Sequence, residues 1–145
     1  MNIEIVNEEL AMTLYGFSGE AINRNYAETG SRLMEKMWEK IKSGGLKHKG
    51  INAWVYEPGD IMFAGVELEN APLNNTELEL KKISLAKYVR YKHIGPYGQL
   101  PEVYRRMKEE SGNRGLKISL PYLEIYGHWT ADETKLETTI LFSLA

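Results

Sequence analysis

The order strand, helix, strand, strand occurs twice in this sequence, and this repeat limits the possible folds more than any other feature. In the first half the four segments are residues 9–17, 29–45, 51–57 and 61–69. In the second half they are residues 83–95, 98–111, 119–127 and 136–144. The last two strands of each half flank a polar turn, which is typical of a β-hairpin.

The spacing of apolar residues indicates the two helices. In the first helix, one face carries Leu33, Met34, Met37, Trp38 and Ile41. In the second helix, the corresponding face carries Leu100, Val103, Tyr104 and Met107. Such spacing at three and four residues is the pattern of an amphipathic helix. Gly44 and Gly45 end the first helix. Pro101 lies near the first turn of the second, where its missing N–H costs nothing.

A polar stretch, residues 70–79, separates the two halves and contains Pro72, Asn74 and Asn75. Residues of these types favour a connector over a strand or helix. We therefore predict an α+β fold with antiparallel sheets and helices on one face. Residues 1–145 form a single domain in this prediction. It consists of two βαββ modules, at about 1–69 and 80–145, that are related by a pseudo-two-fold axis.

Composition excludes several classes of function. The chain of 145 residues carries a net charge of −2, which gives no general attraction to nucleic acid or to an anionic membrane. It has no cysteine, so disulfides, thiolate metal sites and a cysteine nucleophile are excluded. The acidic start "MNIEIVNEEL" does not resemble a signal peptide. No apolar run approaches the roughly 20 residues of a membrane span. We expect a cytoplasmic protein.

The stretch "HIGPYGQLPEVYRRM" joins the first strand of the second half to its helix. Pro96 fixes its own φ and biases Ile94 and Gly95 toward extended geometry. We therefore expect the corner from His93 to Pro96 to direct the helix over the sheet, without contacting a ligand.

Strand alternation separates two faces in each hairpin. One face is aliphatic, with Ala53 and Val55 in the first half and Leu123 and Ile125 in the second. We expect this face to pack under the helices. The opposite face carries Asn52, Trp54, Tyr56, Tyr122, Glu124 and Tyr126. If the halves are equivalent, "WVY" superposes on "EIY", and Trp54 is the counterpart of Glu124.

A carboxylate surrounded by aromatic rings suits an organic cation. The faces of the rings attract positive charge, and the carboxylate supplies the formal counter-charge. Two ordinary explanations remain open at this point: Glu124 as a solvated side chain on an exposed face, and Trp54 as a core residue. The matched positions of Glu124 and Trp54, beside Tyr56 and Tyr126, favour a binding site.

The second half resembles a known family. Its segments "YVRYKHIGPYGQLPEVYRRM", "LPYLEIYGHW" and "LETTILFSL" are similar to the GyrI-like small-molecule-binding domain, which is also the effector-binding domain of AraC-type and MerR-type multidrug regulators. The first half fits through its βαββ order and the hairpin "VYEPGDIMFAGVEL". The resemblance implies a cleft between the two modules that takes small molecules, often cationic and aromatic.

The resemblance also implies a site and a function. The acidic residue of the family that faces the ligand corresponds to Glu124, and the expected ligand-binding residues are Glu124, Trp54, Tyr56, Tyr126, Tyr97 and Tyr88. A second acid of the family is replaced by Thr139, for which Glu137 is a candidate to substitute in part, and Ser143 replaces the usual proline. We expect a stand-alone module that binds a hydrophobic, cationic and aromatic small molecule, without a DNA-binding half.

Two alternatives stay open. Some GyrI-like proteins hydrolyse strained electrophilic natural products, and Glu124 would then be the catalytic residue. The family name also suggests a protein-interaction role such as inhibition of DNA gyrase. No cofactor is expected, and no metal, because the spacing of His48, His93 and His128 matches no metal motif.

Overall fold

The computed structural model describes residues 1–72 and 76–145. Asn74 and Asn75 of the predicted connector therefore lie outside the described residues. The elements within these ranges are β1 (Glu4–Val6), β2 (Leu10–Glu20), η1 (Ile22–Arg24), α1 (Tyr26–Ser43), β3 (His48–Glu57), β4 (Ile61–Leu68), β5 (Glu79–Leu85), β6 (Tyr88–Ile94), η2 (Tyr97–Gln99), α2 (Leu100–Asn113), β7 (Ile118–Tyr126), η3 (Glu133–Lys135) and β8 (Glu137–Leu144).

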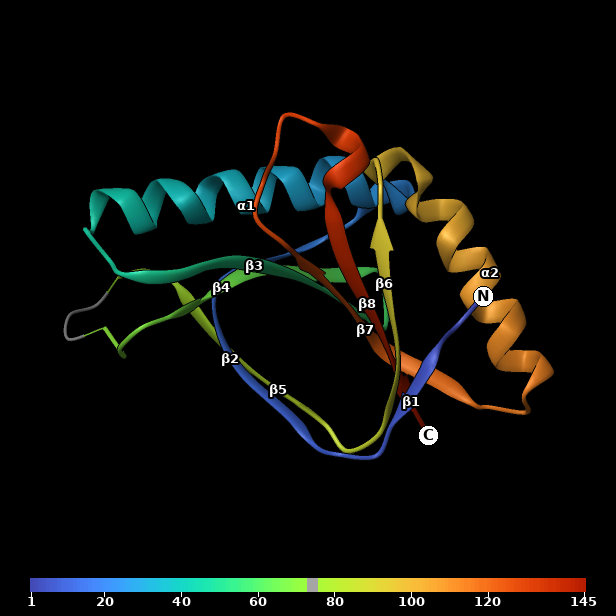
Figure 1. Cartoon of the computed structure of the whole chain (residues 1–145). Coiled ribbons are helices and arrows are strands. Elements are labelled where there is room, and N and C mark those ends of the chain that lie inside the picture. Colours follow the sequence, from blue (N-terminus) through green and yellow to red (C-terminus); the bar gives the residue numbers. More distant parts are fainter. Residues whose placement is uncertain (73–75) are drawn as a thin grey trace.

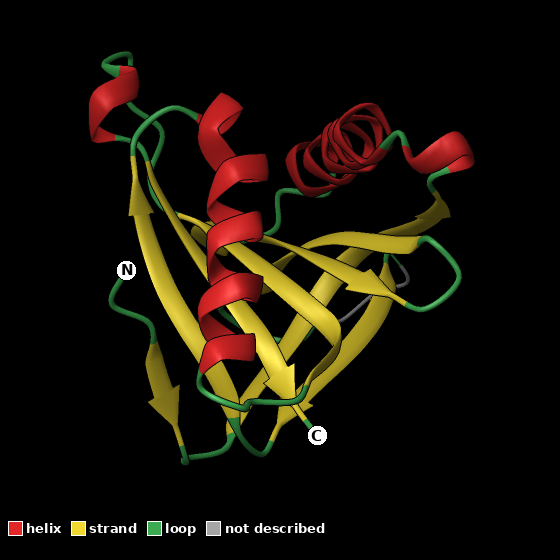
Figure 2. Ribbon diagram, turned by 90° about the vertical axis from the view of Figure 1, so that its right-hand side faces the viewer, coloured by secondary structure: helices red, strands yellow, loops and turns green. Residues whose placement is uncertain are grey.

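The described strands form one antiparallel sheet in the order β1-β6-β8-β7-β3-β4-β2-β5. The predicted α+β fold is thus confirmed, with the two helices on the same side of the sheet (Figures 1 and 2). The βαββ units, β2-α1-β3-β4 and β6-α2-β7-β8, meet where β3 pairs with β7. Trp54 lies directly opposite Glu124 in that pairing. Trp54 and Glu124, which correspond to each other when the two halves of the sequence are compared, are therefore neighbours at the centre of the sheet.

The prediction of one long strand at residues 83–95 was wrong. The chain bends at Ala86 and Lys87, so that β5 pairs with β2 and β6 pairs with β8. Ile83 and Leu85 point into the same apolar cluster as Tyr88, so the inward positions change from odd to even numbers across the bend. Strand β1, which was not predicted, pairs with β6 at the other edge.

The helices cover the opposite face of the sheet from the one we expected. Helix α1 packs on the face that carries Trp54, and α2 packs on the same face over β6 and β8. The other face forms a separate, mostly aliphatic cluster (the aliphatic cluster) without any helix residue: Leu14, Ala53, Val55, Phe63, Ile83, Leu85, Tyr88, Leu123 and Leu141. The sheet curves so strongly that its two ends approach each other on this side (Figure 1). The aliphatic face therefore packs against itself.

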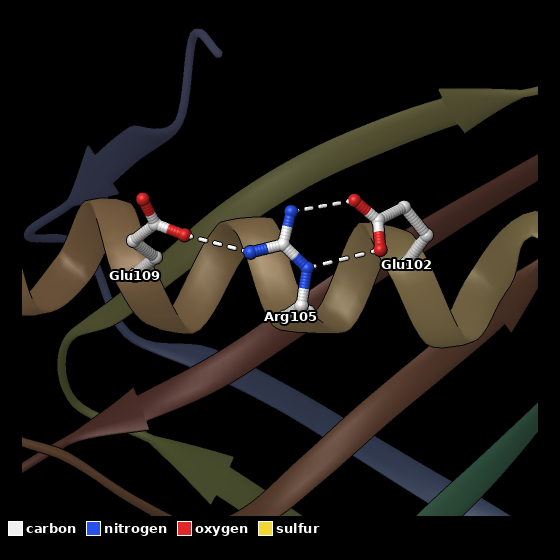
Figure 3. Close-up of polar contacts among 3 residues, drawn as sticks. All are labelled: Glu102, Arg105 and Glu109. Carbon is white, nitrogen blue, oxygen red and sulfur yellow. Dashed lines mark hydrogen bonds and ion pairs between the residues drawn. The ribbon is translucent and has the colours of Figure 1, made fainter.

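Helix α1 begins and ends with recognisable signals. The side chain of Asn25 accepts a hydrogen bond from the backbone N–H of Glu28 at the start of α1. Gly45, with φ of 59°, follows the end of that helix. On the exposed surface of α2, Arg105 donates to Glu102, at 2.6 and 3.0 Å, and to Glu109, at 2.8 Å (Figure 3). These pairs at i, i+3 and i+4 follow the helix register.

The corner between β6 and α2 is held by its own contacts. The backbone N–H of Gly95 donates to the carbonyl of Leu136 at 2.8 Å. A Cβ atom on Gly95, whose φ is 147°, would lie 2.7 Å from the side-chain oxygen of Gln99. His93 is buried, and its Nε2 lies 3.4 Å from the carbonyl oxygen of Pro96. These contacts hold the chain where it passes from β6 to α2, and an architectural role for the corner stays a prediction.

No helix in the part of the chain that the structure describes is long and apolar enough to cross a membrane.

Candidate functional site

A cavity of about 720 Å³ opens between α1 and α2, above the central strands β3 and β7. In Figure 2, α1 is seen end-on beside the upright α2, both on the same side of the sheet. Aromatic side chains supply much of the lining: Tyr26, Trp54, Tyr56, Tyr97, Tyr104, Tyr122 and Tyr126. This size and this lining are typical of a site for a small organic molecule.

Glu124 lies in the cavity wall, with only 4% of its surface exposed. Three phenol hydroxyls donate to its carboxylate. Tyr56 on β3 reaches Oε1 at 2.8 Å, and Tyr104 on α2 reaches Oε2 at 2.7 Å. Tyr126 on β7 also donates to Oε1. Within residues 1–72 and 76–145, no lysine, arginine or histidine forms an ion pair with Glu124.

The three phenols keep their protons at neutral pH. Burial raises the pKa of Tyr104 and of Tyr126 well above the ordinary value, and the negative charge of Glu124 raises both further. Burial, followed by the charge of Glu124, also raises the pKa of Tyr56. All three side chains are therefore hydrogen-bond donors at neutral pH, and Glu124 accepts from each of them.

Trp54 occupies the position in the first module that Glu124 occupies in the second. Its indole lies against Gly30 of α1, where a Cβ atom would come within 2.3 Å of the ring. Its other neighbour is Tyr126, in an edge-to-face contact with 5.4 Å between ring centroids. The buried indole N–H has no hydrogen-bond partner among the described residues. The pseudo-two-fold arrangement thus holds one carboxylate and one indole.

The mouth of the cavity has both exposed and polar groups. Tyr97 is 39% exposed and makes an edge-to-face contact with Tyr126, at 5.5 Å between centroids. On the α1 side, the hydroxyl of Tyr26 donates to Asp60. On the α2 side, the ammonium group of Lys108 lies 5.5 Å from the centroid of the Tyr122 ring.

The structure brings five of the six expected ligand-binding residues to this cavity: Glu124, Trp54, Tyr56, Tyr97 and Tyr126. Tyr88 lies elsewhere. It is buried in the aliphatic cluster on the far face of the sheet, because its side chain points inward with Leu85 and Leu141.

The residues of β8 that differ from the family pattern also lie away from the cavity. Glu137 and Thr139 alternate with Ile140, which is the partner of Glu124 across β7 and β8, so they occupy the opposite face of the sheet. Glu137 pairs there with Lys92 at 3.2 Å. Glu137 therefore does not substitute for a missing acid in the cavity. Ser143 donates to the carbonyl of Pro121 at 2.7 Å.

Sequence reasoning missed Tyr104, Tyr122, Tyr26 and Lys108. Tyr104 was placed on the apolar face of its helix, under which we expected an aliphatic sheet. Once the helix covers the face of Glu124, the same periodicity directs Tyr104 to that carboxylate. The signal was therefore present, and the error lay in the choice of face.

Across the described residues, no group of three or more His, Asp or Glu side chains is placed to hold a metal ion. His48 accepts a hydrogen bond from the backbone N–H of Gly50 at 2.9 Å through its Nδ1 atom.

No known protein-family model and no curated protein matches the sequence. Solved structures do match the fold. The chain covers 99% of the C-terminal domain of EcmrR and is itself covered in full, with 15% identity and a TM-score of 0.72. It spans 56% of the EcmrR chain in a complex with DNA, with 16% identity and a TM-score of 0.66, and 99% of the present chain is covered.

Two further structures resemble the chain over nearly their whole length. SAV2435 bound to tetraphenylphosphonium is 15% identical, with a TM-score of 0.66 and coverage of 100% of this chain and 94% of that one. A hydrolase from Listeria innocua is 13% identical, with a TM-score of 0.60 and coverage of 99% and 91%. The chain therefore shares the fold of the EcmrR C-terminal domain and of SAV2435, in agreement with the fold that the resemblance of its second half predicted.

Proposed function

We propose that this chain binds a hydrophobic, positively charged aromatic molecule in the cavity between α1 and α2. One observation carries the proposal. Glu124 is a buried carboxylate in an aromatic cavity, and no basic side chain of the described residues pairs with it. A ligand that brings a positive charge would complete this arrangement.

The physical argument concerns the cost of the buried charge. An ionised carboxylate loses the favourable hydration of bulk water when it is buried, and hydrogen bonds recover only part of that loss. The hydroxyls of Tyr56, Tyr104 and Tyr126 supply those bonds but no formal positive charge. An organic cation adds the charge, and the surrounding rings attract it through their negative faces.

One structural neighbour supports the same choice of ligand. SAV2435 was solved with tetraphenylphosphonium, which is a hydrophobic cation with four aromatic rings. EcmrR has a C-terminal domain of this fold and forms a complex with DNA.

The phenols leave little of the Glu124 carboxylate free for acid–base chemistry. A catalytic carboxylate needs an oxygen free to take a proton from water or from the substrate. Both oxygens of Glu124 already accept hydrogen bonds from phenols. A reacting water would therefore have to displace one of these phenols or approach a remaining lone pair.

The proposal is tested with a charged and a neutral ligand of similar shape. Tetraphenylphosphonium and triphenylphosphine oxide are titrated against the wild type and Glu124→Gln, with tryptophan fluorescence as the signal because Trp54 lines the cavity. A charge-assisted contact is worth roughly 1.5–3 kcal/mol. We therefore expect Glu124→Gln to weaken the phosphonium about tenfold to a hundredfold, and the neutral ligand far less.

Glu137→Gln is the matched control, because it removes a carboxylate on the opposite face of the sheet. It should leave the affinities for both ligands unchanged. Equal losses for the two ligands in Glu124→Gln would show that Glu124 acts only as a hydrogen-bond acceptor or as a catalytic acid. Turnover of an electrophilic ester by the wild type would then favour the hydrolase. Failure of the wild type to bind the phosphonium would refute the proposal.

A further inference from the structure

The cavity that contains Glu124 also carries a positive charge at its mouth. Lys108 of α2 lines the cavity and places its ammonium group over the Tyr122 ring. The nearby carboxylates of the helix are engaged with other partners, since Glu109 pairs with Arg105 and Glu110 pairs with Arg114. Within the two described ranges, no carboxylate forms an ion pair with Lys108.

Two short routes connect Lys108 with Glu124, one through Tyr104 on α2 and one through Tyr122 on β7. Lys108 follows Tyr104 by four residues, which is about one helical turn or roughly 6 Å along α2, and Tyr104 donates to Glu124. Tyr122 precedes Glu124 by two residues on the same face of β7, which is about 7 Å along the strand. The rings of Tyr104 and Tyr122 lie with their centroids 6.4 Å apart. The positive and negative groups thus flank an aromatic wall.

Other charged groups of the cavity are on the α1 side. Asp60 accepts a hydrogen bond from Tyr26, and Glu57 forms an ion pair with Lys81. Arg24 also lines this side, in η1 before α1. Glu124 and Lys108 are therefore the two opposite charges that share the wall formed by β7 and α2.

We propose that the cavity selects an aromatic zwitterion, whose positive group contacts Glu124 and whose carboxylate contacts Lys108. This inference rests on the proposed function and adds a second charge to the ligand. A simple cation in the cavity is repelled by Lys108, whereas a zwitterion forms a further ion pair there. The two charges of the ligand must be separated by a ring system, because adjacent charges, as in a free α-amino acid, cannot reach both residues.

Rhodamine 110 and rhodamine 123 form a matched pair of probes. Both have the same cationic aromatic system, but rhodamine 110 carries a free carboxylate that is a methyl ester in rhodamine 123. The measured quantity is the affinity for rhodamine 110 divided by that for rhodamine 123. Because Lys108 is exposed, its ion pair is worth at most about 1 kcal/mol. We expect Lys108→Met to lower this ratio about threefold to fivefold.

Arg106→Met is the control, because it removes one positive charge from the exposed surface of the same helix outside the cavity lining. The ratio should stay unchanged in Arg106→Met and be largely kept in Lys108→Arg. An equal fall in Lys108→Met and Arg106→Met would overturn the inference, because general surface charge would then explain the preference.

The failure of this inference differs from the failure of the proposed function. If Glu124→Gln weakens both dyes but Lys108→Met leaves the ratio unchanged, the ligand is a simple cation and the zwitterion is wrong. If the wild type binds neither dye, nor tetraphenylphosphonium, the proposed function itself is wrong. A fall in the ratio that is confined to Lys108→Met supports both the zwitterionic ligand and the proposed function.

Discussion

The carboxylate of Glu124 accepts hydrogen bonds from residues of three different elements. Tyr56 comes from β3, Tyr104 from α2 and Tyr126 from β7, and each donates its hydroxyl to the same carboxylate. Alternation along the strands predicted that Glu124, Tyr56 and Tyr126 share a face. It could not predict the bond from Tyr104, because that contact depends on which face the helix covers.

The tyrosines around Glu124 predict a loss of stability at alkaline pH. Because the pKa values of Tyr56, Tyr104 and Tyr126 are raised in the fold, both states keep these protons below about pH 10. Above that pH the unfolded chain releases them and the folded chain does not. The free energy of unfolding should therefore fall as pH rises past 10, by up to about 1.4 kcal/mol per pH unit for each tyrosine.

Urea unfolding at a series of pH values measures this slope, and the ultraviolet absorbance of tyrosinate reports ionisation in parallel. We expect part of the tyrosinate signal to appear only as the circular dichroism of the fold is lost. Ionisation of all nine tyrosines in a protein that keeps its native spectrum would contradict the prediction.

At the scale of elements, hydrophobic periodicity predicted both helices and both hairpins, because each of these segments is long enough to show its period. Strand β1 is too short for this, with three residues that are not fully buried. The bend at Ala86 and Lys87 could not be separated from a continuous strand, because the flanking residues are apolar on both sides. Alternation distinguishes two faces of a sheet. It does not indicate which face the helices cover, because an aliphatic face can pack under a helix or against a curved sheet.

The contact between Gly30 and Trp54 makes a prediction about α1. Gly30→Ala would normally stabilise a helix, but here the added Cβ atom meets the indole ring at 2.3 Å. We expect the variant to lose roughly 1–3 kcal/mol of stability, because α1 or Trp54 must shift. A change in the emission of Trp54 should accompany the loss.

Gly112→Ala is the control for this variant. It lies in α2, and a Cβ atom there would have no neighbour within 4 Å. We expect it to gain about 0.5–1 kcal/mol from helix propensity. Thermal unfolding compares the two variants, and stabilisation by both substitutions would show that Trp54 gives way at little cost.

At the scale of the whole molecule, the two βαββ units exchange their outer strands. Strand β1 precedes the first unit but pairs with β6 of the second, and β5 precedes the second unit but pairs with β2 of the first. The repeat in the sequence predicted two similar units, yet it carries no information about this exchange. Pairing between distant strands depends on the curvature of the complete sheet, which local periodicity does not record.

The exchange of outer strands predicts that neither half folds alone. In a fragment of residues 80–145, strand β5 has lost its partner β2, and the aliphatic cluster has lost Leu14, Ala53, Val55 and Phe63. In a fragment of residues 1–69, strand β1 has lost β6, and β3 has lost β7. Each fragment would leave a large apolar surface and unpaired strand edges in contact with water.

We therefore expect each fragment alone to lack cooperative urea unfolding by circular dichroism, and an equimolar mixture of the two to regain it together with phosphonium binding. A cooperative transition of fragment 80–145 alone would instead show that the second unit is an independent folding unit, and that the pairing of β5 with β2 contributes little to its stability.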